Sequence, residues 1–141
     1  MASLERLEEY EGNIENVSER VEDSKKELME VQSRLDNLES AIGKLSDDKE
    51  VSESLEQNRD EANLEMERVE HEREQLASEL QEMQEELQEM DEANNESYEV
   101  LSELSSVGED VNEAAKIVQG RRNEIRGNLG RIQQLLRALN M

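Results

Sequence analysis

The sequence predicts an all-α protein, a long antiparallel coiled-coil hairpin followed by a third helix in an elongated helical bundle. Three observations predict this class. The 141 residues include no Pro, Cys, Trp or Phe, and charged residues make up 38% of the chain. A globular α/β or β-sandwich domain fills its core with large aromatic side chains, so this composition leaves long helix or disorder. Apolar residues recur at alternating steps of three and four, and this heptad phase decides for helix.

The first heptad repeat begins at Leu7 and ends at Leu45. With Leu7 at position a and Tyr10 at position d, only Ser24 interrupts twelve seam positions that are otherwise apolar. The flanking e and g positions are almost all polar. A stripe this narrow is typical of a coiled coil rather than of a helix in a globular core. We therefore expect one long helix over most of the first third.

A second repeat runs from Leu55 to Leu139 without a skipped residue, and its phase differs from the first by three residues. The phase changes in a stretch that carries helix-ending and helix-starting signals. Gly43 is a candidate C-terminal cap, and Asp47 stands three residues before Glu50, as in a capping box. We expect a turn near 45–52, with a continuous helix containing a stammer as the alternative.

A turn there lets the two repeats pair antiparallel, with each a position facing a d position. The register that places Ile42 against Leu55 also places Ser24, the one polar seam residue of the first repeat, against Arg73. This matched polar layer favours that register over a slide by one heptad. Among the flanking charges of this register are the attractive pair Arg34 with Glu65 and the repulsive pairs Glu27 with Glu72 and Glu39 with Glu56.

The sequence predicts a hairpin domain over residues 1–92 and a third helix over 93–141. In this last third, apolar side chains also occupy g positions, which widens the stripe as in a helix that touches two neighbours. The chain can reverse at 93–96 or at 105–110, and the unbroken phase also fits one helix that continues past the hairpin. A helix that folds back at the first site would lie beside residues 51–74.

Charge divides the chain unevenly. The net charge is -22, yet residues 116–141 contain six basic residues and one Glu, a net of +5, which leaves -27 on residues 1–115. The acidic majority disfavours binding to nucleic acid, because attraction to phosphate supplies most of that affinity. The basic end either packs on the acidic hairpin or docks on another protein.

The last third therefore carries the candidate interface with a partner protein. Tyr98 lies beside the widened stripe, where it either packs in the bundle or contacts the partner. The glycines of the basic end stand opposite the seam, where they either permit close approach by a partner or mark a loosely ordered helix. The candidate interface residues are Tyr98, Val100, Val107, Ala114, Gly120, Arg121, Arg126, Gly127, Gly130, Arg131 and Arg137.

No motif indicates catalysis. Without Cys the chain lacks thiolate chemistry, and His71, its one histidine, falls on the exposed f position. The acidic residues at 47–50 lack the spacing and glycine of a calcium loop, and no phosphate loop or dinucleotide fingerprint occurs. We expect no enzyme activity, no cofactor, no metal site and no small-molecule substrate.

The start of the chain lacks a signal peptide, and no apolar run approaches the length of a transmembrane helix, so we expect a cytoplasmic protein that does not insert into membranes. The leading hypothesis is a non-enzymatic helical interaction or scaffold protein that contacts itself or a partner. The alternative is a small acidic secretion chaperone or adaptor, secreted without a leader alongside its partner, that shields a hydrophobic helix. An acidic mimic of nucleic acid is a minor alternative.

Overall fold

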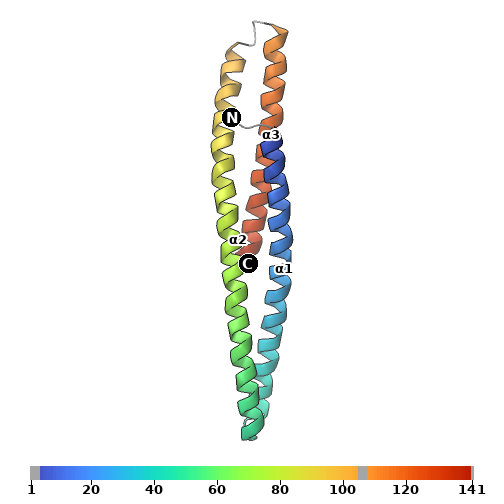
Figure 1. The fold of residues 1–141 in the computed structure, drawn as a ribbon, viewed down its shortest axis with the longest axis vertical. Coiled ribbons are helices and arrows are strands. Elements are labelled where there is room, and N and C mark those ends of the chain that lie inside the picture. The colour runs from blue at the N-terminus through green and yellow to red at the C-terminus, as the bar shows by residue number, and fades with distance from the viewer. Residues whose placement is uncertain (1–3, 105–107, 141) are drawn as a thin grey trace. The chain divides into compact units, whose positions relative to one another are not determined.

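The computed structural model describes residues 4–104 and 108–140. Over this part of the chain it contains three α-helices and no strand: α1 (Leu4–Lys44), α2 (Lys49–Glu103) and α3 (Glu109–Leu139). Helices α1 and α2 are antiparallel and pack against each other, and α3 folds back and packs on both (Figure 1). The predicted all-α class and the predicted hairpin are confirmed, and the third helix does not extend away from them.

The turn between α1 and α2 lies where the phase shift predicts it. Its capping residue differs from the predicted one. Asp48 begins the second helix by accepting a hydrogen bond from the backbone N–H of Val51 at 3.3 Å, so the predicted cap at Asp47 is wrong. Gly43 lies inside α1 and has no positive φ, so it does not form the left-handed C-terminal cap that its position predicts.

The turn between α2 and α3 lies later than the predicted boundary at 92/93. Helix α2 continues through residues 93–96 and ends at Glu103, so the chain reverses at the second of the two candidate sites. One reason is tertiary: Asn94 is buried, and its side-chain amide donates to the backbone carbonyl of Val118 at 2.9 Å. Asn94 therefore contacts α3 inside the bundle, whereas a reversal at 93–96 would have placed it in a loop.

The chain forms two compact units, which are described separately. Residues 19–76 make up the two-helix unit, built from α1 and α2 alone. Its seam is only partly closed, because a pair of helices leaves the sides of its seam open to solvent. Several seam side chains here are half-buried, namely Leu28, Leu35, Leu38, Ile42, Leu55 and Met66.

The predicted register holds in the two-helix unit. Arg73, only 7% exposed, donates a hydrogen bond to the hydroxyl of Ser24 at 3.0 Å, which confirms the matched polar layer. Arg34 and Glu65 form an ion pair at 3.4 Å. The two predicted repulsions are relieved by nearby arginines. These contacts are Arg68 with Glu27 at 3.7 Å, Arg68 with Glu72 at 3.2 Å and Arg59 with Glu39 at 3.6 Å.

The three-helix unit consists of the described residues among 1–18 and 77–141, in which the beginning of α1, the end of α2 and all of α3 lie side by side (Figure 1). The third helix closes the seam that a pair of helices leaves open, so large apolar side chains lose their whole contact with solvent. Its six largest fully buried side chains are Leu7, Ile14, Leu80, Leu87, Ile125 and Ile132.

Candidate functional site

The end of the α2–α3 hairpin is the first candidate site. We call the described residues 94–104 and 108–118 the hairpin tip. The hydroxyl of Tyr10 donates to the carboxylate of Glu86, and α1 begins only at Leu4, so the described part of α1 stops short of the tip (Figure 1). The tip is therefore a two-helix end on a three-helix unit.

Three large apolar side chains are exposed at the tip. Val100 is 56% exposed, Leu104 is 44% exposed and Ile117 is 55% exposed. They remain in contact with water because two helices cannot cover them. The described stretch 94–104 also carries three glutamates and no basic residue. Over its described residues the tip carries six acidic residues and one basic residue, Lys116. Exposed apolar side chains on a mostly acidic helix end suit an apolar helix face bordered by basic side chains.

The predicted interface residues near the tip are only partly accessible. The ring of Tyr98 is half-buried, and the guanidinium of Arg122 lies 5.7 Å from its centroid in a cation–π contact that the sequence pattern did not predict. Ala114 is half-buried, and Val100 is exposed. Val107 lies outside the described residues.

Two arginines of α3 form ion pairs with the hairpin. Arg131 pairs with Glu15 of α1 at 2.7 Å, and Arg126 pairs with Asp91 of α2 at 3.7 Å. The expectation that the basic end lies beside residues 51–74 is wrong, because the later turn moves α3 along α2 by a corresponding length. These two arginines bind within the chain in this structure.

The other predicted arginines differ from this pair. Arg121 is half-buried, and Arg137 is exposed and forms no ion pair within the part of the chain that the structure describes. The glycines at 120, 127 and 130 are exposed, and an added Cβ at each would meet open space. No neighbour among the described residues requires a glycine at these three positions, so packing does not explain them.

Helix α3 packs with several polar groups unsatisfied. Asn94 and Asn128 are 4% and 6% exposed, and one side-chain atom of each lacks a hydrogen-bond partner among the described residues. Each such group costs about 1–3 kcal/mol when it is buried. Arg121 Nε and Arg122 Nε of this unit also lack a hydrogen-bond partner among the described residues, and Oδ1 of Asp91 makes no hydrogen bond although it forms the ion pair with Arg126. The heptad pattern predicts the helix positions of these residues but not whether their side-chain atoms form hydrogen bonds.

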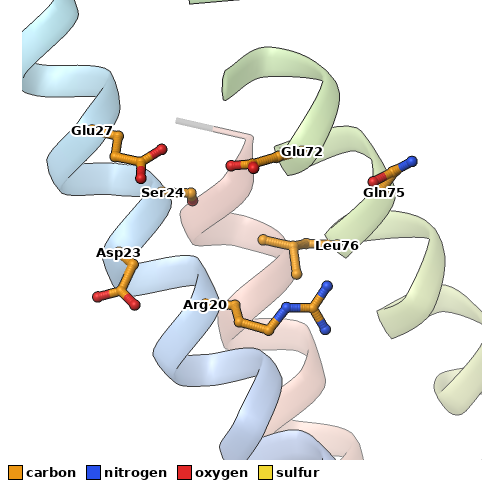
Figure 2. A pocket seen from close by; sticks show the side chains of 7 residues that line it. All are labelled: Arg20, Asp23, Ser24, Glu27, Glu72, Gln75 and Leu76. Carbon is orange, nitrogen blue, oxygen red and sulfur yellow. The ribbon is translucent and has the colours of Figure 1, made fainter. Parts of the chain in front are cut away.

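A hollow of about 230 Å³ in the two-helix unit is the second candidate site. It lies beside the Ser24–Arg73 layer, and Figure 2 shows side chains from α1 and α2 around it. Ligand pockets are mostly apolar with a few polar groups, whereas this lining is mostly charged or polar, with mixed sign. No group of three or more metal-binding side chains occurs among the described residues. The lining residues are Arg20, Asp23, Ser24, Glu27, Glu72, Gln75 and Leu76.

No helix in the described part of the chain is long and apolar enough to cross a membrane. Comparison of the chain with protein-family models, with curated proteins and with solved structures finds no match. The candidate sites are therefore interpreted from their own geometry and chemistry.

Proposed function

We propose that this chain is a non-enzymatic helical interaction protein that binds a partner protein at the hairpin tip. The exposure of three large apolar side chains at the tip, Val100, Leu104 and Ile117, carries this proposal. Side chains of this size at an exposed helix end are typical of a surface that another protein covers. The partner we expect is a helix with an apolar face, bound as one further helix against the end of a pair.

The charges at the tip indicate which charge a partner should carry. Two of the candidate interface arginines of α3, Arg126 and Arg131, pair within the chain. The tip glutamates Glu96, Glu99 and Glu103 are all exposed and can form ion pairs with basic side chains of a partner. We therefore expect basic side chains beside the apolar face of the partner helix, and binding that weakens as salt rises.

A secretion chaperone or adaptor is the second candidate function. The same tip combines apolar and acidic side chains, which suits the shielding of a basic amphipathic helix until that helix is delivered. This version differs from a scaffold in one measurable way: the partner should aggregate when it is expressed without this chain and stay dispersed when the two are expressed together.

The experiment compares three serine substitutions at the tip with three elsewhere. The tip variant combines Val100→Ser, Leu104→Ser and Ile117→Ser. The matched control combines Met29→Ser, Val51→Ser and Leu64→Ser, exposed apolar residues of the two-helix unit. Each chain is used for affinity purification from its native source with quantitative mass spectrometry, and circular dichroism checks that each remains helical.

We expect a partner to be enriched equally by the unchanged chain and by the control variant, and at least tenfold less by the tip variant. A partner that the tip variant retains while the control variant loses it would place binding on the two-helix unit instead. Equal enrichment by all three chains would contradict a role for the exposed apolar side chains.

A further inference from the structure

The two-helix unit is more open on one side of its seam than on the other. In three consecutive layers the side chain at position d is buried, whereas the side chain at position a opposite it is half-buried. Around each helix, position a lies next to position e, and position d lies next to position g. The seam is therefore open on the side of the e positions. In the confirmed register these layers pair Leu28 with Val69, Met66 with Val31 and Leu35 with Ala62.

Acidic side chains border these half-buried residues. Over residues 21–42 of α1 and 55–76 of α2, we call the e and b positions the open side and the g and c positions the closed side. Every residue of the open side is exposed, and eight are acidic while one, Lys25, is basic. Among the described residues only Glu39 of these eight forms an ion pair, with Arg59 at 3.6 Å. The eight are Glu22, Asp36, Glu39, Glu56, Asp60, Glu67, Glu70 and Glu74.

The closed side pairs more of its charges within the chain. Arg34 pairs with Glu65 across the two helices at 3.4 Å. Arg68 pairs with Glu27 at 3.7 Å and with Glu72 at 3.2 Å. These three glutamates lie at g positions and are half-buried, which agrees with closer packing on this side. The two sides of one helix pair therefore differ, because only the open side presents apolar side chains between carboxylates that are mostly without an ion pair among the described residues.

The three-helix unit shows what kind of helix covers the e and b side of this hairpin. The two carboxylates that pair with arginines of α3 both lie on that side, Asp91 at position e of α2 and Glu15 at position b of α1. Helix α3 thus combines a buried apolar stripe with arginines that pair with acidic e and b residues. The exposure along α2 agrees, because the e positions of this unit are half-buried and its g positions are exposed. The half-buried e residues are Ala77, Gln84, Asp91 and Tyr98, and the exposed g residues are Glu79, Glu86, Ala93 and Val100.

We propose that the open side of the two-helix unit binds an amphipathic helix of another protein, which carries a narrow apolar stripe flanked by basic residues. Its apolar side chains cover Leu28, Leu35 and Met66, and its basic side chains pair with the open-side carboxylates. A second copy of this chain fits less well, because its own open side is acidic and brings like charges together. This inference goes beyond the proposed function, since it concerns a second surface, on the unit that does not carry the tip.

The probe is a synthetic peptide of three heptads, about 32 Å long as a helix, with Leu at a and d and Lys at e and g. A second peptide has the same composition in scrambled order. Both carry a fluorophore, and fluorescence anisotropy in low-salt buffer measures their binding to the full-length chain. All titrations use the tip variant Val100→Ser, Leu104→Ser and Ile117→Ser, so that the proposed tip surface does not contribute. We expect the scrambled peptide to bind at least tenfold more weakly.

Charge substitutions then locate the binding surface. Gln32 and Asn63 are exposed at e positions of the open side, and Asn37 and Asn58 are exposed on the closed side. Gln32→Lys with Asn63→Lys should weaken binding of the heptad peptide at least tenfold, because both new charges repel its lysines. Asn37→Lys with Asn58→Lys adds the same charge and should stay within threefold. Gln32→Glu with Asn63→Glu should strengthen binding at least threefold, and circular dichroism checks that each variant remains helical.

Three outcomes overturn the proposal. The scrambled peptide binds as tightly as the heptad peptide, or the two lysine variants weaken binding equally, either of which reduces the binding to general attraction by an acidic chain. The third is a dimer, seen by sedimentation velocity without peptide, that the open-side lysine variant alters and the closed-side one does not, which assigns the open side to a second copy. The tip is already substituted in the peptide titrations, so their failure leaves the proposed function to its own experiment.

Discussion

The two-helix unit and the three-helix unit use the same heptad pattern but bury it to different degrees. In the three-helix unit Leu80 and Leu87 are 0% exposed, whereas the seam leucines at 35 and 38 of the two-helix unit are half-buried, although the smaller Ala62 and Val69 there are also 0% exposed. The difference comes from α3, which covers the side that a pair of helices leaves open. A heptad stripe thus specifies which residues face a neighbouring helix. The number of neighbouring helices determines how much of each apolar side chain stays exposed to solvent.

Hydrogen bonding of the buried polar residues shows the opposite trend to apolar burial. The two-helix unit has a satisfied layer, in which the hydroxyl of Ser24 donates to the carbonyl of Val21 at 2.9 Å and accepts from Arg73. The three-helix unit buries Asn94 and Asn128 with one atom of each unsatisfied among the described residues. Better apolar burial in the three-helix unit therefore coexists with more buried polar atoms that lack a hydrogen-bond partner among the described residues; the two-helix unit has one such atom, Oε2 of Glu27.

The largest expected effect sharpens the contrast in burial. Leu87→Ala removes a fully buried side chain from the three-helix unit and should lower the free energy of unfolding by about 2–5 kcal/mol. Leu38→Ala removes the same atoms from a half-buried site and should cost roughly half as much, because less apolar surface returns to water. Urea unfolding followed by circular dichroism measures both. Equal losses would mean that the third helix adds no protection.

A second prediction concerns the satisfied polar layer. Replacing both partners, Ser24→Leu with Arg73→Leu, should raise the free energy of unfolding by about 1–4 kcal/mol, because a buried charge is exchanged for apolar contact. Ser24→Ala alone should lower it by about 1 kcal/mol, since Arg73 loses an acceptor. The same urea titrations test both variants. A double variant that is less stable than the unchanged chain would show that the polar layer stabilises the pair.

The smallest expected effect is a pH dependence confined to the three-helix unit. Tyr10 is 6% exposed, and burial, followed by its hydrogen bond to Glu86, raises the pKa of its phenol above 10.0. The folded state keeps the proton longer than the unfolded state, so this contribution is complete below pH 10 and is lost as pH rises through the folded pKa. Thermal unfolding from pH 8 to 11 should show a decline above pH 10 that Tyr10→Phe reduces. An identical decline in the variant would exclude the phenol as its source.

Part of the candidate site follows from sequence and part does not. The apolar g positions predicted a candidate interface that includes Val100, and the structure shows Val100 exposed at the tip. The pattern did not predict Ile117 or the contact of Arg122 with Tyr98, because each depends on where α3 ends up beside α2. The sequence left open whether Arg126 and Arg131 pack on the hairpin or contact a partner, and in the structure both pair within the chain.

The sequence by itself determined the helical class, the first turn and the register that joins Ser24 to Arg73. These follow from the period and phase of apolar residues and from a single polar match, which are local or pairwise properties of the chain. Only the tertiary structure decided that α2 continues past Asn94 and that α3 folds back. The physical reason is that a polar residue can end a helix or be satisfied inside a bundle, and the contact with Val118 selects the second outcome.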